Sequence, residues 1–197
     1  MMDKENRNDP GIVRRSRPTK FETREDGNDL IIDGYFVVFN QPYFVSALEE
    51  EVIDPHALDS ADVSDVRGLI DHVSHLVVGR NKANTLTFRV DDIGVFVIIR
   101  LNRADSDAMN LYARVQRGDV DQASFGMTEG EILYSELPDG RIRRTVKTID
   151  KLWEFSVCTF PAYEQTSVGA RSKDASATKE TIRWMKEKVK RSLKHHA

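Results

Sequence analysis

Short runs of alternating apolar and polar residues recur from about residue 19 to residue 160. Residues 19–25 and 29–40 predict two strands joined by a hairpin turn, and residues 84–102 predict a second hairpin. Further strands are expected over residues 66–80, 120–127, 131–137, 141–149 and 151–162. Many short strands with one or two helices predict a β-rich α+β fold, in which a closed or partly closed β-barrel is flanked by helices.

The clearest helical pattern lies in residues 106–118, where the apolar residues follow the i, i+3, i+4, i+7 spacing. Asp105 or Ser106 can cap its start, and Gly118 suits its C-terminal stop. A second, basic helix is expected over residues 179–193, with an apolar stripe made of Ile182, Met185, Val189 and Leu193.

The composition changes twice along the chain and predicts three parts. Residues 1–17 form a polar arm that we expect to be disordered, residues 18–170 form the folded domain, and residues 171–197 form a basic linker and the tail helix. We expect the tail helix to dock on a partner or on its own domain, with a solvated packed helix and a membrane-surface helix as alternatives. The linker is a candidate site of self-cleavage, because it is expected to be exposed and unstructured.

The totals point to a soluble intracellular protein. The chain has 197 residues with 40% apolar and 31% charged residues, and no apolar run approaches the roughly 18 residues of a membrane span. The polar N-terminus excludes a secretory signal. The single cysteine, Cys158, excludes an internal disulfide framework and a cysteine-based zinc cluster.

Charge is distributed unevenly around a net value of −3. Residues 25–170 carry a net charge of −12, whereas residues 1–24 carry +3 and residues 171–197 carry +6. Because an acidic body repels phosphates, we expect no direct role in nucleic-acid binding for the folded domain.

The candidate chemistry centres on Ser124, within the strand-like residues 120–127. One interpretation is that a small hydroxyl ends the strand and Gly126 turns the chain; the other is that Ser124 is a nucleophile that needs a histidine as base. Of the five histidines, His72 and His75 are the candidates, and strand parity would place them on opposite faces of residues 66–80. On this pattern alone, a structural histidine is the commoner outcome.

The last predicted strand contains a candidate acid. Glu154, Ser156 and Cys158 alternate with an apolar face, so a small polar face has room for an imidazole beside Glu154. A solvated glutamate is the plain alternative. Asp71, His72 and His75 suggest a metal site, because His-x-x-His occurs in zinc sites, but no third protein ligand at a suitable spacing joins the two histidines. Cys158 is expected to be a buried core residue.

Taken in order, several stretches resemble the prohead maturation proteases of tailed phages. These stretches are DGYFVVFNQPY, EEEVIDPHAL, GLIDHV running on to VVGR, VDDIGVFVIIRL, VQRGDVDQASFGM and LWEFSVCTFPAYEQTSV, and they cover about residues 18–170. The resemblance implies a herpesvirus-protease-like (assemblin-like) β-barrel and a serine endopeptidase without a cofactor or metal. It also implies the triad His72, Ser124 and Glu154, with Phe125 and Gly126 as candidate oxyanion donors.

The same resemblance implies partners and a setting. The expected substrate is a scaffold protein, or the scaffolding segment of the major capsid protein, together with the protease itself. We expect action inside the assembling procapsid in the host cytoplasm, as a homo-oligomer and without a membrane. The alternative function is a non-catalytic capsid-assembly or scaffolding protein with the same fold.

One departure from the family pattern leaves the third triad member open. Many relatives have an Asn-His-Asp triplet, whereas this chain reads Asp71-His72-Val73. Glu154 is the preferred orienting acid, with Asp71 and Asp92 as the alternatives.

Overall fold

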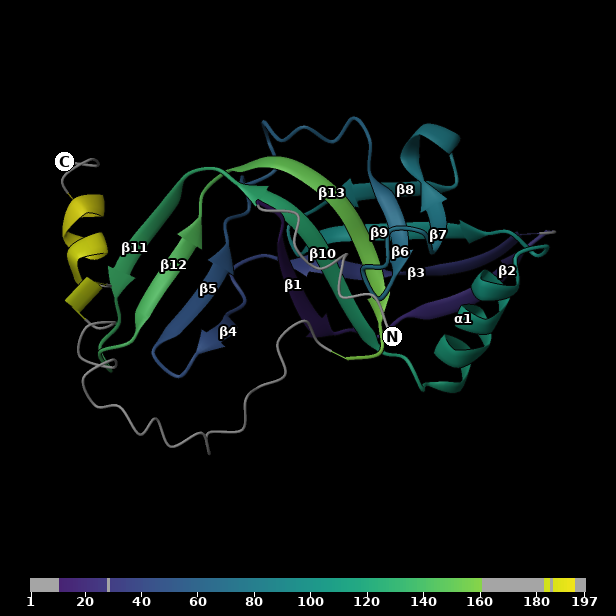
Figure 1. The fold of residues 1–197 in the computed structure, drawn as a ribbon, viewed down its shortest axis with the longest axis horizontal. Helices are drawn as coiled ribbons and strands as arrows, with labels where there is room; N and C mark the ends of the chain where they lie inside the picture. Colours follow the sequence, from purple (N-terminus) through teal and green to yellow (C-terminus); the bar gives the residue numbers. More distant parts are fainter. Residues whose placement is uncertain (1–10, 28, 161–182, 185, 194–197) are drawn as a thin grey trace, which may run out of the picture.

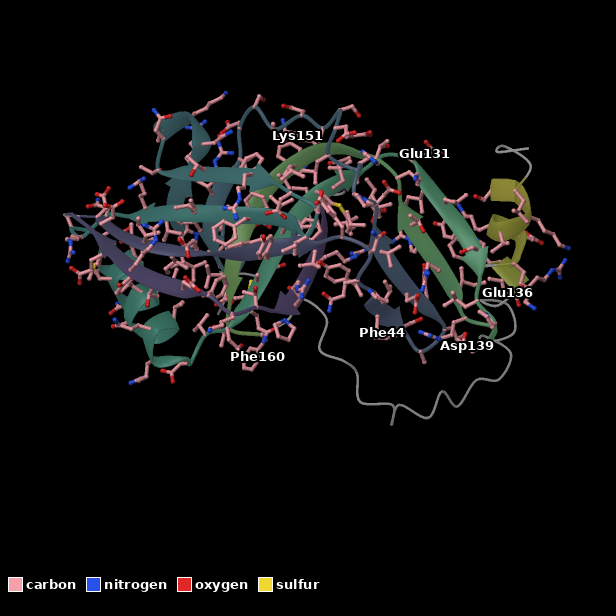
Figure 2. The ribbon with its side chains drawn as sticks, turned by 180° about the vertical axis from the view of Figure 1, so that it is seen from behind. Phe44, Glu131, Glu136, Asp139, Lys151 and Phe160 are labelled. Atoms are coloured by element: carbon pink, nitrogen blue, oxygen red, sulfur yellow. The ribbon has the colours of Figure 1, made fainter. Side chains whose placement is uncertain are left out.

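The computed structural model describes residues 11–27, 29–160, 183–184 and 186–193. Thirteen strands within these residues form three sheets; two of the sheets overlap in the views of Figure 1 and Figure 2, and the third lies to one side. The central sheet has the order β1-β10-β13-β6-β7, with bounds Val13–Pro18, Gln122–Glu129, Ile149–Cys158, Arg67–Ile70 and Val77–Arg80.

The other two sheets have four strands each. The β3 sheet has the order β2-β3-β9-β8, with bounds Glu22–Asp26, Asp29–Val38, Gly94–Leu101 and Leu86–Val90. The β5 sheet has the order β11-β12-β5-β4, with bounds Ile132–Glu136, Ile142–Val146, Glu49–Ile53 and Tyr43–Ser46. A short 3-10 helix, η1, spans Asn81–Ala83, and the helix α1 spans Ser106–Arg117.

The central sheet and the β3 sheet share the main hydrophobic core. Phe155 of β13 lies between Phe36 of β3 and Phe88 of β8, with ring centroids 5.4 Å and 5.6 Å away. Because side chains alternate along a strand, Glu154 and Ser156 face the other side of the central sheet. The candidate acid is therefore placed on the face that the apolar core does not occupy.

The first strand, β1, is held by charge more than by apolar burial. Arg15 is 2% exposed, and its guanidinium donates to the fully buried carboxylate of Glu51 on β5. Arg144 of β12 donates to the same carboxylate at 2.6 Å and to Glu129 of β10 at 2.7 Å. Residues 13–17 thus form a strand within the arm that was expected to be disordered, because buried ion pairs, which an apolar pattern does not report, fix them.

Both predicted hairpins and the α1 helix are confirmed. β2 pairs with β3, and β8 pairs with β9, in each case antiparallel. The carboxylate of Asp105 caps α1 by accepting from the backbone N–H of Asp107 at 2.9 Å, and Gly118 ends the helix with a φ of 84°.

The β-rich class is confirmed, but the expected closed barrel is wrong for the described residues. Each sheet has two free ends in its strand order: β1 and β7, β11 and β4, β2 and β8. Closure needs one continuous ladder around the barrel. Instead, the β10–β13 ladder has register shifts after Gly126 and Thr128, and both strands curve towards the β5 sheet (Figure 1).

Residues 66–80 do not form the single strand that the pattern predicts. β6 ends at Ile70, a turn follows, and β7 begins at Val77. Asp71 and His72 have left-handed backbone angles, with φ of 49° and 61°. The parity argument that set His72 against His75 is therefore wrong, because the imidazole of His72 is presented by a turn.

The tail is helical at residues 183–184 and 186–193 and lies beside β11 (Figure 1). The backbone N–H of Tyr134 donates to Ser192 Oγ at 3.2 Å, and Lys188 Nζ lies 6.0 Å from the Tyr134 ring centroid. Of the predicted apolar stripe, Val189 is partly buried, whereas Leu193 is 62% exposed. Ile182, Met185 and the linker lie outside the described residues. In the part that is described, no helix is both long and apolar enough to span a membrane.

Candidate active site

His72 and Glu154 are in direct contact at the centre of the candidate site. The Nδ1 atom of His72 lies 2.6 Å from Oε1 of Glu154. The turn after β6 presents the histidine, and the central strand β13 presents the acid, with β6 and β13 running parallel side by side. Glu154 is 5% exposed, so this carboxylate is withdrawn from water and faces the imidazole directly.

The second ring nitrogen of His72 has no such contact. Nε2 is buried, and among the described residues it has no hydrogen-bond partner. A carboxylate accepts a hydrogen bond from Nδ1–H, so this contact leaves the lone pair on Nε2. The arrangement orients the imidazole to accept a proton at Nε2.

Two further groups surround the Glu154 carboxylate. Ser156 Oγ donates to Oε2 at 2.5 Å, and Arg14 Nε lies 3.8 Å from Oε1. Gly126, opposite Glu154 on β10, makes room for the carboxylate, because a Cβ atom there would lie 2.6 Å from Oε1. Gly126 therefore allows the Glu154 carboxylate to lie close to the β10 backbone, and it does not turn the chain.

Ser124 lies on the same face of the central sheet. It pairs with Ser156 across β10 and β13 and with Ser16 across β1 and β10. Its hydroxyl is fully buried and donates to the backbone carbonyl of Arg15 at 2.9 Å. The structure thus brings His72 and Glu154 into contact, while the Ser124 hydroxyl is engaged with β1 and not with His72.

The two alternative acids are placed elsewhere. The carboxylate of Asp71 accepts from the Thr159 backbone N–H at 2.8 Å and from its hydroxyl at 3.2 Å. Asp92 is exposed in the turn between β8 and β9. Of the acids Glu154, Asp71 and Asp92, it is Glu154 whose carboxylate contacts the His72 imidazole.

The candidate oxyanion donors, Phe125 and Gly126, lie within β10. This strand is paired on both sides, with β1 and with β13. The N–H groups of an interior strand are directed towards its neighbours. In this state, neither backbone amide is presented to a substrate carbonyl.

The remaining candidates occupy other surroundings. Cys158 is buried, and burial raises the pKa of its thiol well above the ordinary value, which disfavours a thiolate nucleophile. His75 is exposed in the turn before β7. Within the described residues, no group of three or more His, Cys, Asp or Glu side chains is arranged to hold a metal ion.

Sequence reasoning missed the roles of Ser156 and Arg14. Ser156 was noted as a small residue that leaves space, although its two-residue spacing from Glu154 on one strand placed both on the same face. Arg14 belongs to the polar run that was expected to be disordered. A signal for it could have come only from knowing that β1 pairs with β10.

Comparison with known proteins identifies the family of the chain. The family model described as Caudovirus prohead serine protease matches residues 19–181. The chain is 30% identical over 173 residues to the prohead protease of Enterobacteria phage HK97. The matched region covers 87% of this chain and 74% of that protein.

A solved structure is similar in fold. The capsid assembly protease of bacteriophage T4 matches with a TM-score of 0.50 and 11% sequence identity, over 78% of this chain and 100% of that one. The family match and the HK97 relative show that this protein is a serine protease with a role in prohead maturation. The chain belongs to the caudovirus prohead serine protease family.

Proposed function

We propose that Ser124, His72 and Glu154 are the catalytic triad of this protease. Ser124 Oγ attacks the scissile carbonyl while Nε2 of His72 accepts its proton, and the same nitrogen then delivers that proton to the leaving amine. In the second step, water activated by the same histidine hydrolyses the acyl-enzyme and releases the Ser124 hydroxyl. Glu154 holds Nδ1–H and offsets the charge of the imidazolium. The observation that carries the proposal is the 2.6 Å contact between His72 and Glu154.

This proposal requires a change at Ser124 before the reaction. The hydroxyl must give up its bond to the Arg15 carbonyl and turn towards Nε2 of His72. Ser124 lies on the same sheet face as Ser156 and Glu154, and rotation of its side chain about χ1 is the smallest change that redirects the hydroxyl. Phe125 and Gly126 both serve as oxyanion donors only if the pairing of β10 with β1 and with β13 loosens nearby.

The substrates, partners and setting belong to the same proposal. The protease cleaves a scaffold protein, or the scaffolding segment of the major capsid protein, and itself, inside the assembling procapsid in the host cytoplasm. It acts as a homo-oligomer. For the fold, the proposal is a partly closed arrangement of sheets and helices similar to that of the herpesvirus protease.

Co-expression with the cognate major capsid protein tests the function. Mass measurement of the products should show a shortened capsid protein with the wild-type chain and full-length capsid protein with Ser124→Ala. Ser135→Ala, in the exposed part of β11, is the matched serine control and should process normally. Full-length capsid protein in every culture would favour the alternative of a non-catalytic assembly protein. Continued processing by Ser124→Ala would refute the assignment of the nucleophile.

A further inference from the structure

Ser156 links the two partners of the His72–Glu154 contact. Its hydroxyl oxygen donates to Glu154 Oε2 at 2.5 Å and accepts from the backbone N–H of His72 at 3.2 Å. One buried atom therefore touches the side chain of the acid and the backbone of the histidine. Glu154 is in consequence fixed at both carboxylate oxygens, by His72 at Oε1 and by Ser156 at Oε2.

The strand that carries Ser156 is well suited to hold this geometry. β13 is an interior strand of the central sheet, and Ser156 pairs with Ser124 on β10 and with Leu69 on β6. Ser156 is 0% exposed, so water does not compete for its hydroxyl. It stands between the histidine turn on one side and the proposed nucleophile on the other.

The turn at His72 needs such support. Asp71 and His72 are consecutive non-glycine residues with left-handed φ angles, which cost conformational free energy unless surrounding contacts compensate. β13 supplies those contacts: Val157 accepts from the Asp71 backbone N–H at 3.1 Å, and Ser156 accepts from that of His72. Ser156 therefore holds the backbone of His72, the residue whose imidazole contacts Glu154.

We infer that Ser156 is a positioning residue of this protease, which holds both the His72 backbone and the Glu154 carboxylate so that Nε2 of His72 is presented to Ser124. Ser156 makes no bond with the substrate in this role. The inference rests on the proposed triad.

Kinetics of Ser156→Ala give the first test, with a peptide that spans the junction cut in co-expression. Removing a buried hydrogen bond to a charged group should lower kcat by about 10- to 100-fold. KM should stay within about twofold, because Ser156 acts through His72 and Glu154. Cys158→Ala, a buried change two residues along the same face, is the matched control and should keep kcat within about twofold.

A spectroscopic signature separates positioning from general stability. In the Ser124→Ala background, which prevents self-cleavage, the His72 Nδ1–H proton should give a resolved low-field NMR signal. Adding Ser156→Ala should broaden or abolish that signal while the backbone amide spectrum stays folded, and adding Cys158→Ala should leave it. Ser156→Thr keeps a hydroxyl and should retain the signal; it is the deciding variant if Ser156→Ala does not fold.

The outcomes are distinguishable. If the wild-type chain cleaves no substrate, the proposed function fails, while the NMR comparison still reports on Ser156. An unchanged Nδ1–H signal or an unchanged kcat in folded Ser156→Ala overturns the inference. So does loss of the signal in folded Ser156→Thr, or equal loss in Cys158→Ala.

Discussion

His72 and Glu154 meet with 2.6 Å between Nδ1 and Oε1, although 82 residues separate them along the chain. The contact exists because the turn after β6 and the middle of β13 lie side by side in the central sheet. It places a buried carboxylate behind one imidazole nitrogen and leaves the other without a partner among the described residues.

Glu154→Gln should lower kcat by up to about 10⁴-fold, the scale found when the orienting acid of a serine protease triad is neutralised. The amide keeps the shape of the side chain but no longer stabilises an imidazolium. Steady-state cleavage of the junction peptide measures the effect. Asp71→Asn is the comparison, because the Asp71 carboxylate holds Thr159 and not the ring. If Asp71→Asn is the more damaging change, Glu154 is not the orienting acid.

Gly126→Ala should impair catalysis without unfolding the protein. Its Cβ atom would lie 2.6 Å from Oε1 and 3.1 Å from Cγ of Glu154, so the acid must move away from His72. We expect kcat to fall by about 10-fold or more, since a buried charged hydrogen bond is lost. Circular dichroism should show a native fold. Met127→Leu, a volume-conserving change on the core face of β10, should behave as wild type, and full activity in Gly126→Ala would contradict the close approach.

Stability should depend on Asp65 at acidic pH. Its carboxylate accepts from Arg80 Nε and Nη2, both at 2.7 Å, and the hydrogen bond from Arg80 lowers the pKa of Asp65 to about 2. The unfolded pKa is about 3.9, so the unfolded state takes up the proton first as pH falls. The stabilisation is complete above about pH 4 and is lost as the pH falls towards 2.

Urea unfolding of wild type and Asp65→Asn between pH 2 and 7 measures this dependence. The difference in unfolding free energy should be constant near neutral pH and shrink towards zero at pH 2. A difference that grows as the pH falls would show that the charged carboxylate does not stabilise the contact between the β5–β6 segment and β7.

Cys158 should be unreactive in the native protein at neutral pH. Its thiol is buried, and burial raises its pKa, so almost no thiolate is available. Iodoacetamide should add to the denatured chain but not to the folded one, as measured by mass. Rapid alkylation of the folded protein, accompanied by loss of activity, would reopen a role for the cysteine.

The sequence predicted elements whose signal is local. Both hairpins and the capped helix α1 follow from turn residues, strand alternation and the Asp105 and Gly118 caps, each of which acts over a few residues. Glu154 could also be placed on a small polar face from alternation alone. The approach of His72 to that face came from the family resemblance, not from periodicity.

The parts that the sequence did not predict depend on distant contacts. The sequence of β1 resembles a disordered polar arm, because the strand is held by the ion pair between Arg15 and Glu51, which lies 36 residues away. The His72 turn reads as a strand because apolar residues flank it, whereas its left-handed backbone depends on bonds to β13. The β10–β13 ladder carries register shifts and the sheets are open, and register shifts have little signature in an alternating pattern.

The most direct test of the central claim is the identity of the activated serine. The protein is treated with a serine-directed fluorophosphonate while it processes co-expressed capsid protein, and the adduct is located by peptide mass spectrometry. The account predicts one adduct, on Ser124, and its loss in His72→Ala. An adduct on Ser156 or another serine, an equal yield in His72→Ala, or no adduct on a protein that is cutting its substrate would contradict it.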